Sequence, residues 1–256
     1  MDKENHQQRQ NEDLIVGRNA VSEALRAGRE IDHVLTARGE RSGSLGALLA
    51  RCRKQGVPIK EVDVRKLDAL CGPQHQGIAA VAACKGYVTL EDLFDAAQAK
   101  GEPPFFVVCD ELEDPHNLGA VMRTAEAVGA HGVVIPKRRS AGLTSAVYKA
   151  SAGAVEYVPV ARVANLVDAL REMKKRGVWI YGLDMDGDTW CQADLRGAVA
   201  VVVGSEGQGI GRLVREQCDF MLKLPMRGHI TSLNASVACG VLLYEVARQR
   251  GEISAR

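Results

Sequence analysis

A short apolar run that breaks into four glycines is the stretch of this sequence best suited to hold a ligand. Residues 199–203 are apolar and rich in valine, as a strand covered on both faces requires, and glycines follow at 204, 207, 209 and 211. Because glycine has no Cβ, backbone N–H groups in such a loop can approach a bound molecule closely. An ordinary strand-to-helix turn also uses glycine, but a plain turn has no need of the charged Glu206. We therefore expect a ligand loop here.

A second polar stretch, Asp114 to Arg123, follows an apolar run and leads into a predicted helix. Open parallel sheets bind ligands at the carboxyl ends of their strands, which is where this stretch is expected. Asn117 stands at the expected N-cap of the helix, and Arg123 lies off its buried stripe. An arginine at such an edge can bind phosphate or carboxylate through two parallel hydrogen bonds. The simpler interpretation leaves Asn117 as a cap and Arg123 in solvent.

A third stretch, residues 223–236, forms a long loop before the last predicted helix. Either Ser232 or Asn234 can cap that helix. A loop of this length that also carries apolar side chains can form a pocket for a flat heterocycle, lined by Leu224, Met226 and Leu233.

Three common ligand motifs can be weighed against these residues. A phosphate-binding P-loop needs Gly-Lys-Ser/Thr, but Gly209 is followed by Ile210, so this motif is excluded. A dinucleotide site is harder to dismiss, yet only 52 residues (256 − 204) follow Gly204, too few for the usual βαβαβ half. A serine hydrolase would need a G-x-S-x-G elbow, which is absent. His116 and His229 remain candidates only through their positions in loops.

Composition limits the class of protein. The 256 residues, 46% of them hydrophobic, suffice for one large or two ordinary domains, and the net charge of +1 gives no overall preference for nucleic acid. Seven cysteines lie far apart without CxxC pairs or zinc-like histidine spacing, so we expect a reducing compartment and no metal. Residues 1–13 are polar and are expected to form a disordered tail. No apolar run approaches the length of a membrane helix, so we expect a cytoplasmic protein without membrane contact.

Residues 14–84 are expected to form a compact α/β unit. This segment contains 11 Lys and Arg and 7 Asp and Glu, a net charge of +4 that indicates a polyanionic partner or simply a solvated basic face. The periodicity predicts helices over 19–27, 45–54 and 64–70, and strands over 31–35, 59–62 and 78–83.

Residues 85–104 are interpreted as a linker that contains one short helix over 90–99, and residues 105–256 as the catalytic domain. Repeated βα units in this domain favour an α/β fold with a mostly parallel sheet between helices. The expected strands are 105–109, 133–135, 155–160, 178–183, 199–203 and 221–224, and the expected helices are 118–128, 144–151, 165–176, 210–217 and 234–250.

In this order and spacing, the three stretches resemble the motifs of the SpoU (TrmH) family of RNA 2′-O-ribose methyltransferases. The matching segments are DPHNLGAVMRTAEAVGA at 114–130, VVVGSEGQGI at 201–210, and LPM with ITSLNASVA within 224–238. Residues 14–84 resemble the small RNA-binding domain of the subgroup that methylates a guanosine ribose in large-subunit ribosomal RNA. The resemblance implies a SPOUT-type α/β domain with a deep trefoil knot near the C-terminus, a homodimer, and S-adenosylmethionine as the cofactor.

The resemblance also assigns roles to residues. It implies that the cofactor is held by Gly204, Glu206, Gly207, Leu224, Met226, Ser232 and Leu233. It implies a catalytic set of Asn117, Arg123, Glu206, Ser232 and Asn234, in which Asn117 and Arg123 face the ribose. A transfer RNA substrate and a non-catalytic RNA-binding or assembly factor of the same fold remain as alternatives, and a nucleotide-dependent oxidoreductase ranks last.

Overall fold

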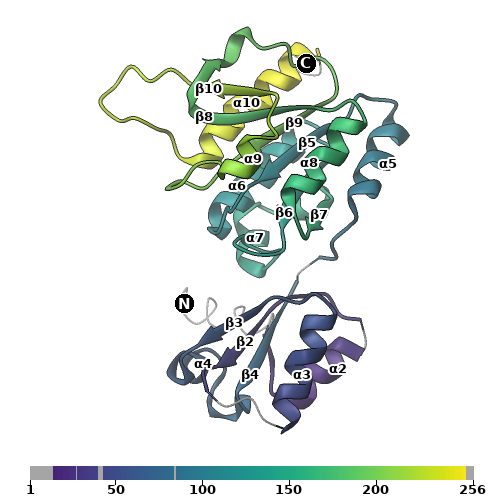
Figure 1. Ribbon diagram of the computed structural model, residues 1–256, viewed down its shortest axis with the longest axis vertical. Helices are drawn as coiled ribbons and strands as arrows, with labels where there is room; N and C mark the ends of the chain where they lie inside the picture. Colours follow the sequence, from purple (N-terminus) through teal and green to yellow (C-terminus); the bar gives the residue numbers. More distant parts are fainter. Residues whose placement is uncertain (1–13, 27, 40–42, 84, 252–256) are drawn as a thin grey trace. The chain divides into compact units, whose positions relative to one another are not determined.

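The computed structural model describes residues 14–26, 28–39, 43–83 and 85–251, which form two compact units. The predicted tail, residues 1–13, lies outside the described residues. The smaller unit contains the described residues up to Gly86, and the larger one contains Tyr87–Ala141 and the chain from Ala146 onward (Figure 1).

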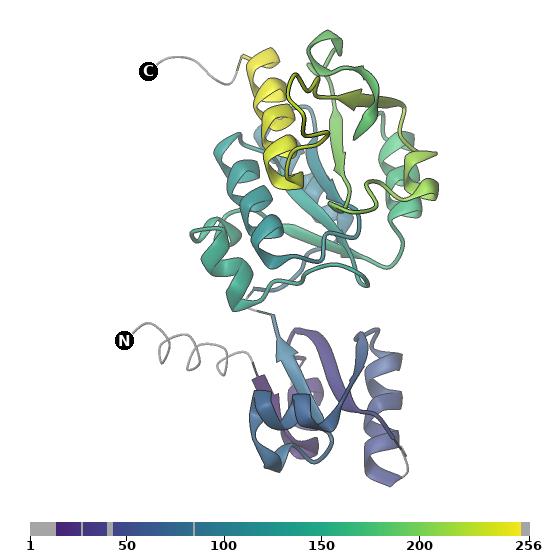
Figure 2. The same cartoon turned by 90° about the vertical axis from the view of Figure 1, so that its left-hand side faces the viewer.

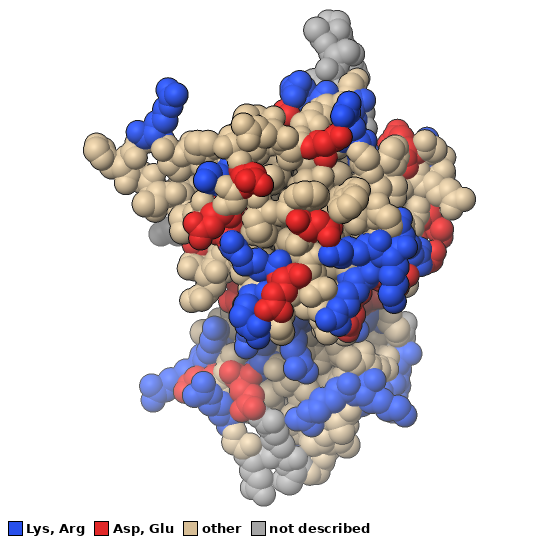
Figure 3. All heavy atoms as spheres, turned by 45° about the horizontal axis from the view of Figure 1, so that its top comes forward, with Lys and Arg blue, Asp and Glu red and all other residues tan. Residues whose placement is uncertain are grey.

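The smaller unit is a four-stranded sheet packed against helices. Its strand order is β1-β4-β2-β3, with β2 and β3 parallel and the other two pairings antiparallel. In the view of Figure 3, Lys and Arg side chains outnumber Asp and Glu on this unit. The elements are β1 (Leu14–Val16), α2 (Arg18–Arg26), β2 (Ile31–Ala37), α3 (Gly43–Lys54), β3 (Ile59–Val62), α4 (Val64–Cys71), η1 (Pro73–His75) and β4 (Ile78–Ala82).

Two details of this unit differ from the expectation. Strand β1 was not predicted, because three residues are too few to show an alternation. Asn19 lies inside α2, which begins at Arg18, and so it does not cap that helix. The core is formed by apolar residues of α2, α3 and the sheet, with Val21, Leu49 and Cys52 fully buried.

The larger unit contains a six-stranded sheet in the order β10-β8-β9-β5-β6-β7, and all five pairings are parallel. The predicted α/β class with a mostly parallel sheet is therefore confirmed. Its strands are β5 (Phe105–Cys109), β6 (Gly132–Pro136), β7 (Val160–Val163), β8 (Trp179–Thr189), β9 (Val199–Val203) and β10 (Phe220–Lys223).

Helices cover both faces of this sheet. On one face, α5, α8 and α9 bury Leu93, Leu170 and Val214 against Phe106 and Val202. On the other face, α6 and α10 lie side by side (Figure 2). The helical elements are α5 (Leu90–Lys100), α6 (Pro115–Ala127), α7 (Ser145–Ala150), η2 (Ala154–Glu156), α8 (Leu166–Lys175), η3 (Trp190–Gln192), α9 (Arg212–Arg215) and α10 (Ala235–Gln249). No helix among the described residues is long and apolar enough to cross a bilayer.

Two expectations for this region need correction. The segment 155–160 is not a strand: Gly153 adopts φ +87°, the turn η2 follows, and β7 begins only at Val160. Val155 and Val158 are buried there in a turn, and valines in a short segment do not by themselves distinguish a buried turn from a strand. The helix in the expected linker, α5, packs Leu93 into the core of the larger unit, so it is structurally part of that unit.

Candidate active site

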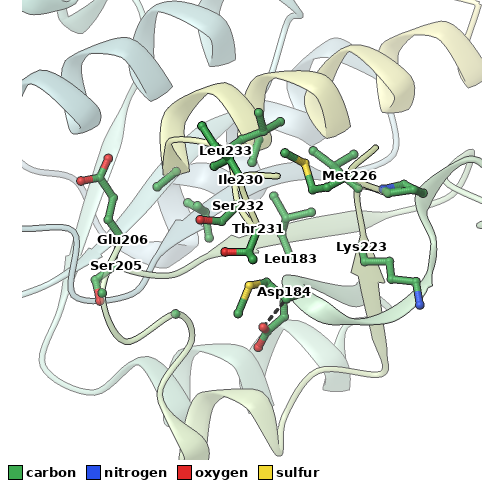
Figure 4. A pocket seen from close by; sticks show the side chains of 18 of the residues that line it. Leu183, Asp184, Ser205, Glu206, Lys223, Met226, Ile230, Thr231, Ser232 and Leu233 are labelled. Atoms are coloured by element: carbon green, nitrogen blue, oxygen red, sulfur yellow. Dashed lines mark hydrogen bonds between the residues drawn. The ribbon is translucent and has the colours of Figure 1, made fainter. Parts of the chain in front are cut away.

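A pocket of about 690 Å³ opens at the carboxyl edge of the sheet, where β9 and β10 end and beside Leu183 and Asp184 of β8. In Figure 4, Ser205 and Glu206 lie on one side of it and Lys223 and Met226 on the other, with Thr231 and Ser232 between them. Six of the seven predicted cofactor residues line it: Glu206, Gly207, Leu224, Met226, Ser232 and Leu233.

The seventh predicted cofactor residue, Gly204, sits where two backbone segments cross. A Cβ at Gly204 would lie 2.1 Å from both the carbonyl carbon and the oxygen of Gly209, and 2.4 Å from the nitrogen of Ile210. Real Cβ atoms do not approach other atoms so closely, so this crossing requires glycine. The chain can therefore fold back on itself at the very end of β9.

The fold-back forms a small closed loop that carries Glu206. Ser205 N donates to Gly209 O at 3.1 Å and Gly209 N donates to Ser205 O at 2.9 Å, with Gly209 at φ +64°. Beyond the loop, Gly211 N donates a 2.7 Å bond to the carboxylate of Asp110 at the end of β5. Burial raises the pKa of Asp110, and the Gly211 N–H partly offsets that rise. These bonds fix the loop against two neighbouring strands.

Three of the predicted catalytic residues meet in one hydrogen-bond network. Asn117 Nδ2 donates to Glu206 Oε1 at 3.0 Å, and Asn234 Nδ2 donates to Asn117 Oδ1 at 2.9 Å and also to Glu206 Oε1. The three come from the start of α6, the glycine loop and the start of α10. The network thus ties the three sequence motifs together beside the pocket.

The N-cap of α6 differs from the expectation, whereas that of α10 is one of the two residues expected. Asp114, not Asn117, is the N-cap of α6, because its carboxylate accepts from His116 N at 3.0 Å and Pro115 occupies the first turn. Asn117 lies one turn later and its side chain is free to bind Glu206. Asn234 does cap α10, accepting from Ser236 N at 3.0 Å and Val237 N at 3.2 Å. Its amide nitrogen remains available for the network.

Arg123 is not brought to the pocket. It lies on the exposed side of α6, and the pocket lining does not include it. Within the part of the chain that the structure describes, its side chain has no hydrogen-bond or ion-pair partner. Arg123 therefore belongs neither to the pocket lining nor to the network of Asn117, Glu206 and Asn234.

Asp184 is a pocket residue that the sequence motifs did not indicate. It follows the buried part of β8, lines the pocket, and pairs with Arg215 of α9. Its position directly after an apolar strand segment, as with Glu206 after β9, is the signal that could have identified it. Ile230 and Thr231 also line the pocket and belong to the third stretch without having been assigned a role.

The pocket fits S-adenosylmethionine in size and lining. Its volume lies within the range of small-molecule sites, about 300 to 1,000 Å³. Glycines 207, 209 and 228 expose backbone to it, and apolar side chains suited to a flat base come from Leu224, Met226, Ile230 and Leu233. Among the described residues, no cluster of His, Cys, Asp or Glu could hold a metal ion, and the described cysteines are free thiols.

Comparisons with known proteins agree with this geometry. Residues 104–244 match the model of the SpoU rRNA Methylase family, and residues 14–88 match the model described as RNA 2′-O ribose methyltransferase substrate binding. The chain is 51% identical over 245 residues to YacO of Bacillus subtilis (strain 168), which is named as a TrmH family tRNA/rRNA methyltransferase, covering 95% of this chain and 98% of YacO.

Solved structures give the same family. The SpoU methyltransferase AviRb from Streptomyces viridochromogenes, in complex with the cofactor AdoMet, matches with a TM-score of 0.58 and 25% identity, over 93% of this chain and 90% of AviRb. The A. aeolicus TrmH/SpoU tRNA modifying enzyme matches with a TM-score of 0.54 and 30% identity, over 64% of this chain and 85% of that one. This chain therefore belongs to the SpoU (TrmH) family and is an S-adenosylmethionine-dependent RNA methyltransferase.

Proposed function

We propose that this enzyme transfers a methyl group to the 2′-hydroxyl of a guanosine ribose in large-subunit ribosomal RNA. The observation that carries the proposal is the network of Asn117, Glu206 and Asn234 at the mouth of a pocket suited to S-adenosylmethionine. A basic N-terminal unit, with its net charge of +4, supports a polyanionic substrate. The two matched family models, an rRNA methylase and a ribose methyltransferase substrate-binding domain, support the choice of ribosomal RNA and of the ribose.

The reaction requires little of the protein beyond placement and removal of one proton. When bound, S-adenosylmethionine supplies a methyl group that its sulfonium already activates. The backbone of Gly204 and Gly207 and the side chains of Leu224, Met226 and Leu233 would orient that group. Ser232 and the amide of Asn117 would hold the ribose in line with it. Glu206 would keep the two asparagine amides in place.

We assign Arg123 to binding the phosphate next to the target ribose and stabilising the alkoxide as it forms. A guanidinium stays protonated near neutral pH, which makes it a poor proton acceptor but a good partner for negative charge. Its exposed side chain on α6 is free of carboxylate partners within the described residues, so it is available to RNA.

A homodimer would explain why Arg123 lies outside the pocket of its own chain. An apolar groove runs between α6 and α10, lined among others by Ala120, Val237, Gly240 and Tyr244. Val237 and Tyr244 are about half exposed, at 53% and 49%, and they lie together in this groove; contiguous exposed apolar surface marks sites of protein contact. A second copy seated on this groove would bring α6, and with it Arg123, close to a neighbouring subunit.

The proposal is tested by methyl transfer from labelled S-adenosylmethionine to unmodified transcripts of large-subunit ribosomal RNA and, separately, transfer RNA. Wild type is compared with Arg123→Ala and with Lys175→Ala, a control that removes an exposed cation from α8 on the opposite face of the sheet. We expect label on ribosomal RNA, resistance of one linkage to alkaline cleavage, and loss of label only with Arg123→Ala.

The other outcomes separate the alternatives. Label on transfer RNA alone would keep the chemistry and overturn the substrate. No label on either RNA, with S-adenosylmethionine still bound, would favour an assembling ribosomal particle as the substrate or a non-catalytic RNA-binding factor. An Arg123→Lys enzyme with the turnover of wild type would contradict bidentate phosphate binding by Arg123.

A further inference from the structure

A groove of about 740 Å³ lies on the smaller unit between α2 and α3, and it shares no lining residue with the methyl-transfer pocket. It is lined mainly by side chains that can donate hydrogen bonds, and no carboxylate or aromatic ring is among its described lining residues. The polar and basic members are Arg18, Asn19, Ser22, Ser44, Arg51 and Gln76.

Arg18 is held in place by neutral groups. Its Nε donates to the carbonyl oxygen of Gln76 at 3.0 Å, and one terminal nitrogen donates to Ser44 Oγ at 3.0 Å. Gln76 is itself anchored, because its side-chain oxygen accepts from the backbone nitrogen of Arg18 at 3.1 Å. The guanidinium is therefore oriented without being neutralised, and N–H groups remain for an incoming anion.

Arg51 supplies a second cation on the α3 side of the groove. Its side chain is half-buried, yet within the described part of the chain it has neither a hydrogen-bond partner nor an ion-pair partner. An unpaired arginine that is partly removed from water is costly unless a ligand provides the compensating charge. Two guanidiniums flanked by two serine hydroxyls match the oxygens of phosphate groups.

We propose that the α2/α3 groove binds phosphates of the RNA backbone, so that binding of the substrate in this groove does not depend on which bases it carries. Bases would require an aromatic platform or a mixed set of donors and acceptors, whereas arginines and hydroxyls without a carboxylate favour phosphate. The inference rests on the RNA methyltransferase activity of the family, and it does not depend on whether the RNA is ribosomal or transfer RNA.

The test is filter binding of the full-length protein to unmodified transcripts of large-subunit ribosomal RNA and of transfer RNA, at several salt concentrations. The variants are Arg18→Ala/Arg51→Ala and, as a control with the same change in charge, Arg53→Ala/Lys54→Ala. Both control residues are exposed on α3 and neither lines the groove. Arg51→Ala alone guards against misfolding, since that side chain makes no bond that the fold needs, and thermal unfolding is recorded for every variant.

We expect Arg18→Ala/Arg51→Ala to bind the RNA that wild type binds about tenfold more weakly near 0.1 M salt. The slope of its log affinity against log salt should become shallower by about 1.5, as for two lost phosphate contacts. The control should lose much less, and Arg51→Ala should lose about half of the effect on the slope. Affinity for S-adenosylmethionine should be unchanged in all variants.

Equal losses in the groove and control variants would mean that only the general charge of the unit matters, and would overturn the inference. So would an unchanged salt slope in the groove variant. Titration with inorganic phosphate is a second measurement. If the groove variant loses phosphate binding but keeps its RNA affinity, the ligand of the groove is a free anion and not the RNA backbone. Because RNA binding is measured directly, an absence of methyl transfer would refute the proposed function without deciding whether the groove binds RNA.

Discussion

Asn117 and Glu206 are 89 residues apart in the chain, and the amide of Asn117 donates a 3.0 Å hydrogen bond to the Glu206 carboxylate. The same carboxylate oxygen accepts from Asn234, so one atom orders two amides from two different helices. We therefore propose that Glu206 holds the site together and does not take the proton.

The first prediction separates these two roles of Glu206. Glu206→Gln keeps a side-chain oxygen that can accept both amides, whereas Glu206→Ala keeps none. If Glu206 orders the site, the glutamine variant should retain at least about a tenth of wild-type turnover and the alanine variant far less, a difference of at least about tenfold or 1.4 kcal/mol in activation free energy. Single-turnover methylation rates decide this, and equal inactivity of the two variants would point to Glu206 as the base.

Asn234 should show two separable contributions. Asn234→Asp keeps the oxygen that caps α10 but removes the amide donor and places a second carboxylate beside Glu206, whereas Asn234→Ala removes both functions. We expect the alanine variant to lose about 1 kcal/mol of stability through the lost cap. The aspartate variant keeps the cap, which a helix N-terminus favours for a carboxylate, so its loss of stability should come only from repulsion by Glu206. Both should lose most of their turnover. Thermal unfolding and methylation rates measured together test this. An active aspartate variant would show that the amide donor is dispensable.

Gly204→Ala should disrupt the pocket, because the new Cβ would have to displace the backbone of Gly209 and Ile210. Overpacking of this kind costs about 1 to 3 kcal/mol, and the displaced loop carries Glu206. We expect weaker S-adenosylmethionine binding by calorimetry and a lower Tm. Gly197→Ala is the matched control, since a Cβ there meets nothing within 4 Å and this glycine has no positive φ. Unchanged cofactor affinity of Gly204→Ala would contradict the requirement for glycine at this backbone crossing.

Much of this fold could be predicted from local patterns. The strands 59–62, 105–109 and 199–203 have the predicted bounds. The last two are short apolar runs, and the first has apolar residues at its ends between Pro58 and Asp63. The prediction of a strand over 155–160 was wrong because the buried valines of this segment lie in a turn. The predicted start of α6 lay too far along the chain, because Asp114 and Pro115 begin the helix before Asn117.

The site was predictable only where motifs exist. Local patterns place Glu206 and Asn234 in loops, but nothing in them shows that their side chains meet with that of Asn117. Asp184 escaped notice because its role depends on β8 lying beside β9 in the sheet, a long-range pairing. The expected knot is implied only by the family resemblance, since the general rule is that chains do not thread their own loops.

The proposed dimer makes a prediction for α10. Val237→Glu would place a charge in the apolar groove between α6 and α10, where a second copy would bury it. We expect the variant to be monomeric by sedimentation and to lose methyl transfer, with little change in its Tm because Val237 is 53% exposed within the chain. Glu126→Lys, an exposed charge change on α6 away from the groove lining, is the control. A fully active monomer would refute a shared site.

The last prediction concerns pH and His131. Its ring is buried, accepts from Phe105 N at 3.1 Å and bonds to Glu102 at 3.0 Å. Burial lowers the pKa of His131, with Lys100 adding to the effect and Glu102 opposing it. As the pH falls below about 6.5, the unfolded chain therefore binds a proton that the folded chain does not, and the free energy of unfolding decreases. Denaturant unfolding between pH 7 and pH 5 should show a steeper loss for wild type than for His131→Gln, in which this group no longer titrates. Parallel pH profiles of the two proteins would exclude His131 as a source of acid sensitivity.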